Sequence, residues 1–198
     1  GLSQAARQAG WPGLYIGDMS QPRGGPMMTG HASHQLGLDA DIWMLPPRSL
    51  RLSPAERESI SSQSVVAKGG IRPSPLWSAS HHALLRAAAS DRRVARIFVD
   101  PVAKVAMCQM ETGNRDWLRK IRPINAHDYH FHVRLSCPNQ GCENQAAPPP
   151  GDGCAEAEQW IRNRINPPPQ PPGDPDYRHP RSFRLSEMPR TCQALVAR

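Results

Sequence analysis

Two histidines at positions 130 and 132 form the part of the sequence with the clearest chemical meaning. The segment 129–135 reads YHFHVRL and alternates apolar and polar residues with the period of two that is typical of a β-strand. His130, His132 and Arg134 therefore project from one face and the apolar residues from the other. The polar face of a half-buried strand more often carries Ser, Thr or Lys, so two neighbouring imidazoles favour metal binding or proton transfer. The alternative interpretation is a pair of solvent-exposed histidines.

A second segment, HASHQLGLDAD at residues 31–41, can supply further ligands. His34 precedes a turn that contains glycine, and Asp41 lies on the polar face of the strand predicted to follow. The turn can bring the imidazole and the carboxylate together, and either His130 or His132 can add a third ligand. Two histidines and one carboxylate leave a fourth position open for water, which is the composition of a catalytic zinc site. Zinc would acidify that water and polarise the carbonyl of a scissile peptide bond.

The histidine of the pair that does not bind metal can act as a base beside it. Near neutral pH an imidazole can take a proton from the water and pass it to the leaving amine. His127 lies outside the strand alternation, so the sequence does not predict the direction of its side chain. It either assists as a second base or binds the developing oxyanion. His31 is either a substrate or ligand-shell contact or a histidine of a surface loop.

The hydrophobic pattern predicts an α+β fold. A small, mostly antiparallel sheet carries the metal site and is flanked by helices and long loops. The 198 residues include 22 prolines, many of them between residues 146 and 180, where no continuous helix or central strand can form. We therefore predict a metallopeptidase domain over residues 1–145 and a Pro-rich C-terminal extension over 146–198. The predicted helices are 80–89, 101–108, 115–122 and 155–164, and the predicted strands are 38–44, 96–99 and 129–135.

The net charge of +7 comes from scattered basic residues, without a Lys/Arg-rich run or a nucleic-acid motif. We interpret it as a basic surface, with attraction to an anionic substrate such as peptidoglycan as the alternative, and we expect no nucleic-acid partner. No apolar run reaches the length of a membrane span. The chain starts with Gly1 rather than Met, so we expect a signal peptide and an N-terminal segment to precede it. The oligomeric state is not predicted.

Five cysteines, none of them in a C-x-x-C pair, argue against a structural zinc knuckle. Cys137 and Cys142 flank a Pro-Asn-Gln-Gly turn and can close a small loop through a disulfide bond. Disulfide bonds would indicate an oxidising compartment. The odd number leaves either a free thiol or a cysteine whose partner lies outside this chain.

The segment SHQLGLDAD at 33–41 resembles the Ser-His-x-x-Gly-x-x-x-Asp motif of the LAS group of metallopeptidases, named for lysostaphin, D-alanyl-D-alanine metallopeptidases and sonic hedgehog. HFH at 130–132 matches the His-x-His motif of that group. More narrowly, residues 14–154 are similar to the penicillin-insensitive murein endopeptidases. The segments that carry this similarity are, in order, IGDMSQPRGG, GHASHQLGLDADIW, RIFVDP, RDWLRKIRP and HVRLSCP.

This resemblance implies zinc ligands at His34, Asp41 and His132, with His130 as the general base or electrostatic stabiliser. It implies cleavage of the D-alanyl–meso-diaminopimelyl cross-link of peptidoglycan in the periplasm, without an acyl-enzyme serine and hence without sensitivity to β-lactams. The residues expected nearby, as a second base or as substrate and ligand-shell contacts, are His127, His31, Ser33 and Arg23.

The resemblance also implies a pattern of disulfide bonds. Cys108 would pair with Cys154, and Cys137 with Cys142. Cys192 would pair with a cysteine of the preceding N-terminal segment, which accounts for the odd number.

Two other functions remain alternatives. One is a DD-carboxypeptidase or dipeptidase on the same scaffold; many of these carry a Glu three residues before the last histidine ligand, where this chain has Tyr129. The other is a non-catalytic module that binds the cell wall. The complete set of His34, Asp41, His130 and His132 favours an enzyme, because a binding module has no need of the second imidazole.

Overall fold

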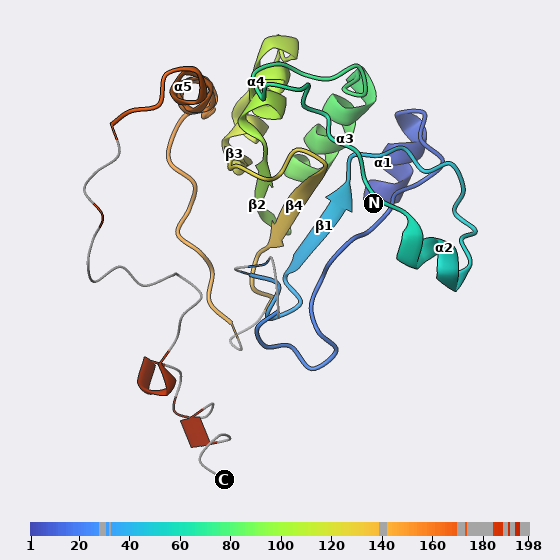
Figure 1. Cartoon of the computed structure of the whole chain (residues 1–198), viewed down its shortest axis with the longest axis vertical. Coiled ribbons are helices and arrows are strands. Elements are labelled where there is room, and N and C mark those ends of the chain that lie inside the picture. The colour runs from blue at the N-terminus through green and yellow to red at the C-terminus, as the bar shows by residue number, and fades with distance from the viewer. Residues whose placement is uncertain are drawn as a thin grey trace.

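The computed structural model describes residues 1–27, 31, 33–138, 142–169, 173, 184–187, 190 and 193–194. The chain is α+β, as predicted, with five α-helices and one four-stranded sheet in the described residues (Figure 1). The helices are α1 (Leu2–Gln8), α2 (Pro54–Ser59), α3 (Ala79–Ser90), α4 (Pro101–Met110) and α5 (Cys154–Ile165). The strands are β1 (Asp39–Trp43), β2 (Val94–Val99), β3 (Ile121–Pro123) and β4 (His130–Leu135), and two 3₁₀ helices are η1 (Asp116–Lys120) and η2 (Leu185–Glu187).

The sheet is mixed, so the prediction of a mostly antiparallel sheet is wrong. Its strand order is β1-β4-β2-β3. Strand β4 pairs antiparallel with β1 and with β2, whereas β3 pairs parallel with β2. The reason is the crossover through α4 and η1, which returns the chain to the sheet edge in the original direction. The helix predicted over 115–122 is present only in part, as the 3₁₀ helix η1 over Asp116–Lys120, and its last two residues belong to β3 instead.

One face of the sheet is apolar and covered by helices. Ile42 of β1 and Val133 of β4 lie on this face and line an apolar hollow together with residues of α1 and α3. Figure 1 shows α1 and α3 beside the sheet. Leu84 and Leu85 of α3 are 1% exposed and belong to the hydrophobic core that includes these strands. The opposite face of β1 and β4 is therefore left for polar side chains, because successive residues of a strand point to opposite sides.

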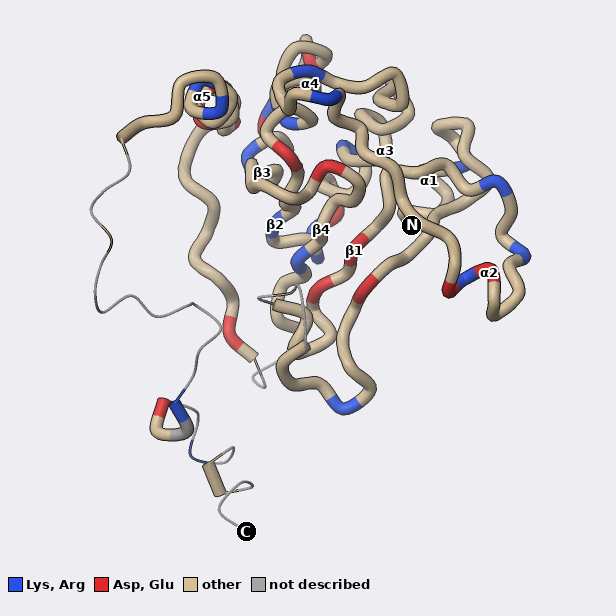
Figure 2. Tube along the Cα trace, in the orientation of Figure 1, with Lys and Arg blue, Asp and Glu red and all other residues tan. Residues whose placement is uncertain are grey.

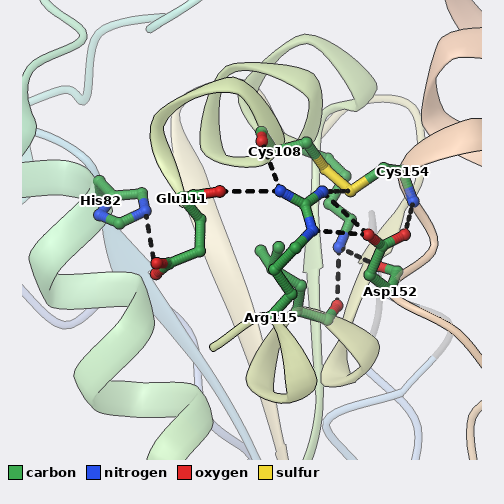
Figure 3. The surroundings of a disulfide bond; sticks show 8 residues. His82, Cys108, Glu111, Arg115, Asp152 and Cys154 are labelled. Carbon is green, nitrogen blue, oxygen red and sulfur yellow. Dashed lines mark hydrogen bonds and ion pairs between the residues drawn. A yellow bond between two sulfur atoms is a disulfide. The ribbon is translucent and has the colours of Figure 1, made fainter. Parts of the chain in front are cut away.

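A polar cluster surrounds the disulfide bond between Cys108 of α4 and Cys154 of α5. Its charged residues, here called the disulfide cluster, are Lys104, Glu111, Arg115 and Asp152. The guanidinium group of Arg115 donates hydrogen bonds to the carbonyl oxygens of Cys108 and Glu111 and to the carboxylate of Asp152 (Figure 3). The cluster and the disulfide bond join α5 to α4.

The second disulfide bond, Cys137–Cys142, closes a short loop after β4. Cys192 lies outside the described residues, as does most of the predicted Pro-rich extension after residue 169. The helix predicted at 155–164 is present as α5. In the described part of the chain, no helix is both long and apolar enough to cross a membrane.

Candidate metal centre

Pairing of β1 with β4 brings the two sequence motifs together. The register places Asp41 opposite His132, and Trp43 opposite His130. Side chains directly opposite one another in an antiparallel pair lie on the same face, about 5 Å apart at Cβ. The period-two alternation of both strands therefore delivers a carboxylate and two imidazoles to the uncovered face of the sheet.

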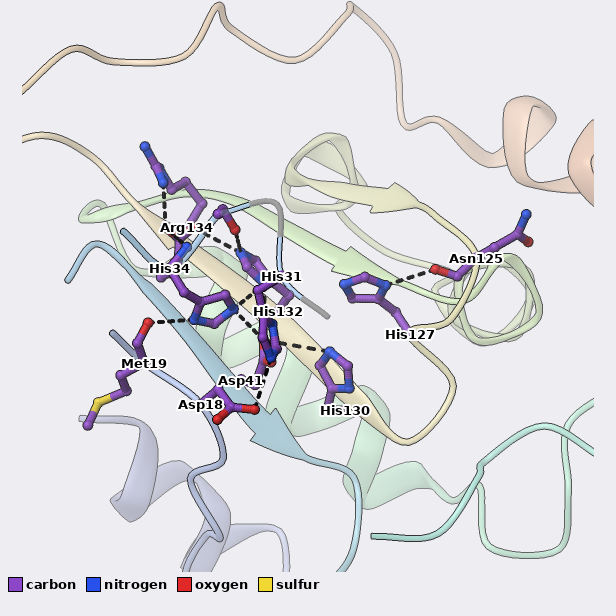
Figure 4. A network of polar contacts seen from close by, with 12 residues as sticks. Asp18, Met19, His31, His34, Asp41, Asn125, His127, His130, His132 and Arg134 are labelled. Carbon is purple, nitrogen blue, oxygen red and sulfur yellow. Dashed lines mark hydrogen bonds and ion pairs between the residues drawn. The ribbon is translucent and has the colours of Figure 1, made fainter. Parts of the chain in front are cut away.

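His34 reaches the same place from the loop before β1. It is 1% exposed and has a positive φ of 63°, a conformation that is uncommon for residues other than glycine. Its backbone N–H donates to Asp39 Oδ2, at 3.1 Å. Its ring Nδ1 lies 2.6 Å from the carbonyl oxygen of Met19, which only accepts, so Nδ1 carries the proton and Nε2 offers a lone pair (Figure 4).

Three ligand atoms, here called the metal triangle, meet at the buried end of this loop. Asp41 Oδ1 lies 3.2 Å from His34 Nε2 and 3.0 Å from His132 Nδ1, and the two nitrogens are 3.1 Å apart. Donor atoms held about 2.1 Å from a tetrahedral zinc ion stand about 3.4 Å from one another. Asp41 Oδ1 is buried and has no hydrogen bond of ordinary geometry among the described residues. The donor set and its spacing therefore fit a zinc ion.

His31 forms a second, wider group with the same residues. Its ligand atom and those of His34 and Asp41 lie within 4.8 Å of one another. However, its Nδ1 is 3.9 Å from Asp41 Oδ2, and its Nε2 is 3.2 Å from the carboxylate of Asp18. The triangle with His132 is closer to the separation of tetrahedral ligands than the group with His31.

Asp39 orients both histidines of the triangle. Its Oδ1 lies 2.9 Å from His132 Nε2, and its Oδ2 accepts from the backbone of His34 and from Arg134. A carboxylate on the outer nitrogen of a histidine ligand sets the tautomer and directs the other nitrogen to the metal. Sequence reasoning did not assign this role, although the strand alternation places Asp39 on the same face as Asp41.

The two histidines of β4 differ in pKa, because they have different charged neighbours. Burial alone would lower the pKa of His132, but its interactions with the carboxylates of Asp39 and Asp41 raise it to about 9. Burial lowers the pKa of His130 to about 4, and the charge of Asp41 opposes this only in part. Burial would raise the pKa of Asp41, but its interactions with the histidines hold it below the ordinary value. His130 is therefore neutral at pH 7 and can accept a proton.

His130 and His127 lie beside the metal triangle. His130 Nε2 lies 3.6 Å from Asp41 Oδ1, and its buried Nδ1 has no hydrogen-bond partner among the described residues. The ring of His127 lies 4.7 Å from that of His130, and its Nδ1 contacts the carbonyl oxygen of Asn125 at 3.0 Å (Figure 4). Burial lowers the pKa of His127, so it too favours the neutral form.

The triangle opens into a cleft of about 460 Å³. The residues that line it are His31, Ser33, His34, Phe98, Ile124, Asn125, Ala126, His127, His132 and Gln145. Ser33 Oγ lies 3.4 Å from His132 Nε2, so this residue is placed at the site. Arg23 is exposed, and within the described residues no hydrogen bond or salt bridge joins it to the cluster. The structure thus brings together the predicted site residues of the two motifs and His127, whereas Arg23 lies apart from them.

A comparison with protein families places this geometry in context. Residues 1–197 match the family model described as penicillin-insensitive murein endopeptidase. The chain belongs to this family.

Curated members of the murein endopeptidase family are similar over most of the chain. A penicillin-insensitive murein endopeptidase of Haemophilus influenzae is 43% identical over 176 residues, which are 86% of this chain and 59% of that relative. One of Salmonella newport is 41% identical over 199 residues, covering 98% of this chain and 69% of that relative. The chain thus spans about three fifths of the length of the first relative.

The cleft also contains contacts that the sequence did not reveal. Phe98 of β2 packs with its ring 5.7 Å from that of His132 and forms part of the cleft wall. Asn125 holds His127 through its backbone carbonyl. Phe98 could have been placed from the alternation of β2, whereas Asn125 lies in a loop and gives no such signal.

Proposed function

We propose that this chain is a zinc-dependent endopeptidase that hydrolyses the D-alanyl–meso-diaminopimelyl cross-links of peptidoglycan. Membership of the murein endopeptidase family supports the reaction class and the substrate. The observation that carries the zinc dependence is the metal triangle, in which two imidazole nitrogens crowd a buried carboxylate oxygen that lacks a hydrogen-bond partner among the described residues.

His34, Asp41 and His132 would hold the ion. When bound, zinc supplies a water of lowered pKa and a Lewis acid for the scissile carbonyl. His130 accepts the proton of the attacking water, because burial keeps its imidazole neutral. It then donates that proton to the leaving amine. His127 lies beside His130 and, with its Nδ1 held by Asn125, turns Nε2 toward the reacting groups as a second base or as an oxyanion contact.

We also propose that the protein acts in the periplasm on peptidoglycan. The two disulfide bonds support an oxidising compartment, and the family supports a cell-wall substrate. A DD-carboxypeptidase or dipeptidase on this scaffold is the competing reaction. Tyr129, which is 43% exposed beside the cleft histidine His130, stands where many of those enzymes carry Glu.

The direct test is digestion of purified, cross-linked muropeptide dimers, followed by mass spectrometry. The protein is assayed as purified, after treatment with a chelator, and after zinc or magnesium is added back. We expect dimers to become monomers, the chelator to stop the reaction, and zinc but not magnesium to restore it. Release of single D-alanine residues from monomers would instead support the carboxypeptidase. Intact dimers with stoichiometric bound zinc would contradict the proposal for this chain.

A further inference from the structure

A basic depression lies next to the metal cleft. It has a volume of about 420 Å³. Its lining, here called the basic hollow, contains four cationic side chains and one carboxylate, that of Asp116. The cationic residues are Arg92, Arg96, Arg119 and Lys120. Figure 2 shows that the charge also differs between the strands, with acidic residues on β1 and basic residues on β2 and β4.

The basic hollow adjoins the metal cleft and shares one lining residue with it. Gln145 lines both depressions. Phe98 packs against His132, and the guanidinium carbon of Arg96 lies 5.8 Å from the centre of the Phe98 ring. Arg96 and Phe98 are two residues apart on β2, so they share the face that carries the metal triangle and lie about 7 Å apart along the strand. The hollow therefore starts one or two peptide residues away from the metal triangle.

The cations of the hollow form no salt bridge within the described residues, although Lys120 Nζ donates to the backbone carbonyl oxygen of Asp91. Within the described residues, no acidic side chain forms a salt bridge with any of the four, whereas seven other arginines of the chain do form salt bridges. Arg96 and Arg119 instead donate to backbone carbonyl oxygens of residues 146–149. A carbonyl oxygen orients a guanidinium group but does not neutralise its charge.

Arg96 also keeps an unused donor. Its Nε is buried and has no hydrogen-bond partner in the described part of the chain. Burial and then the positive charge of Arg122 lower the pKa of Arg96. A buried donor without a partner is costly, and a planar guanidinium group is suited to binding a carboxylate through two hydrogen bonds.

We propose that the basic hollow binds a free carboxylate of the peptide whose cross-link lies at the metal triangle. This inference rests on the proposed function, because peptide arms of peptidoglycan supply such carboxylates. Arg96 makes the direct contact at the end nearer the cleft, and Arg92, Arg119 and Lys120 supply the surrounding positive charge. The hollow thereby selects substrates with an anionic group one or two residues from the scissile bond.

The test compares two synthetic cross-linked peptides, one with free carboxylates and one with the same groups as amides. We expect wild-type protein with zinc to favour the carboxylate form in kcat/KM by about tenfold or more, the value of charge-assisted hydrogen bonds. That preference should fall about tenfold in Arg96→Gln, mainly through KM, and in part in Arg92→Gln. Arg92 is exposed and forms no hydrogen bond or salt bridge with another described residue.

Arg48→Gln is the matched control, because it removes the same charge from an exposed position outside the hollow. The preference should persist in this variant. An equal loss in Arg48→Gln would assign the effect to the overall basic surface and overturn the proposal. So would a wild-type protein that cleaves both peptides with the same kcat/KM.

A binding measurement separates this proposal from the proposed function. Calorimetry with an uncleavable monomeric peptide, in its carboxylate and amide forms, is carried out on the zinc-free protein. We expect the carboxylate form to bind wild type about tenfold more tightly than the amide form does. The Arg96→Gln variant should bind the two forms equally. If neither cross-linked peptide is cleaved but this difference persists, the proposed reaction fails while the basic hollow stands. Equal binding of both forms overturns the hollow.

Discussion

The disulfide cluster and the metal triangle differ in whether their buried polar atoms have hydrogen-bond partners within the protein. In the disulfide cluster, Lys104 is 0% exposed, yet its Nζ donates to the carbonyl oxygens of Leu118 and Asp152, at 2.7 and 2.6 Å. In the metal triangle, Asp41 Oδ1 lies within 3.6 Å of three imidazole nitrogens and still has no well-formed hydrogen bond among the described residues.

The difference indicates which cluster is complete by itself. Buried polar groups in a structural cluster are normally hydrogen-bonded, because an unpaired donor or acceptor costs about 1–3 kcal/mol. Arg115 meets this condition with a carboxylate and two carbonyl oxygens. In the triangle, buried Asp41 Oδ1 has no such partner among the described residues, which is what a site for an added cation requires. Four predictions test this contrast, from the largest expected effect to the smallest.

Removal of one triangle ligand should empty the metal site, whereas removal of the neighbouring base should not. We expect His132→Ala to lose bound zinc and to cleave cross-links about 10³-fold or more slowly, because several kcal/mol of transition-state stabilisation disappear. His130→Ala should keep the metal and lose about 10²–10⁴-fold in rate. Metal analysis and muropeptide digestion give both values.

The control for these variants is His82→Ala, whose ring contacts Glu111 and Trp117 away from the cleft. It should retain metal and activity. If His130→Ala also empties the site, the roles of ligand and base are exchanged or both histidines share the metal.

Loss of the Cys108–Cys154 bond should reduce stability and leave the triangle intact. The bond joins residues 46 apart, and the loop-closure estimate for the double Ser variant is a loss of about 4 kcal/mol in the free energy of unfolding. The Cys137–Cys142 pair, only 5 apart, should cost about 2 kcal/mol. Urea unfolding measures both, and zinc titration checks the site. Zinc affinity that falls in parallel with stability would show that the two clusters are coupled.

Asp39→Asn should weaken zinc binding without emptying the site. The amide holds His132 Nε2 less firmly and leaves Arg134 without its buried anion, so we expect a loss of about 10- to 100-fold in zinc affinity. Competition with a chelating dye measures it. Asp18→Asn is the matched control, because that half-exposed carboxylate contacts only the more distant His31. Equal losses of zinc affinity in the two variants would contradict the role of Asp39 in orienting the histidine ligands.

Lys104 should make stability rise with pH. Burial lowers the pKa of Lys104 from 10.5 to about 7, with Asp152 opposing this in part. Between pH 7 and 10.5 the unfolded chain therefore binds a proton at this residue that the folded chain does not. The free energy of unfolding gains up to about 1.4 kcal/mol per pH unit in this window and loses that gain as the pH falls toward 7. The neutral amine still donates both hydrogen bonds.

Urea unfolding of wild type and Lys104→Met between pH 7 and 9 isolates this contribution. The difference between the two stabilities should widen with pH in favour of wild type. Parallel curves would show that the amine stays charged in the folded protein.

Much of the fold followed from local patterns. The strand predicted at 129–135 is confirmed as β4, and the helix predicted at 80–89 as α3. The helix predicted at 115–122 is confirmed only over Asp116–Lys120, as the 3₁₀ helix η1, because its amphipathic pattern did not reveal that Ile121 would pair with β2. Pairing between distant segments has no signature in a local window, so the parallel edge of the sheet could not be predicted.

The geometry of the candidate site likewise followed only in part from local sequence patterns. Alternation in β1 and β4 determined by itself that Asp41, His130 and His132 would share the polar faces of their strands, because side chains of a strand alternate sides regardless of context. Only the tertiary structure decided that His34 and His132, 98 residues apart, would place their nitrogens 3.1 Å from each other. That contact depends on the positive φ of His34 and on the hold of Met19 and Asp39, which are long-range packing outcomes. The position of the basic hollow beside the cleft was decided in the same way, because β2 and the loop at 144–148 meet only in the folded chain.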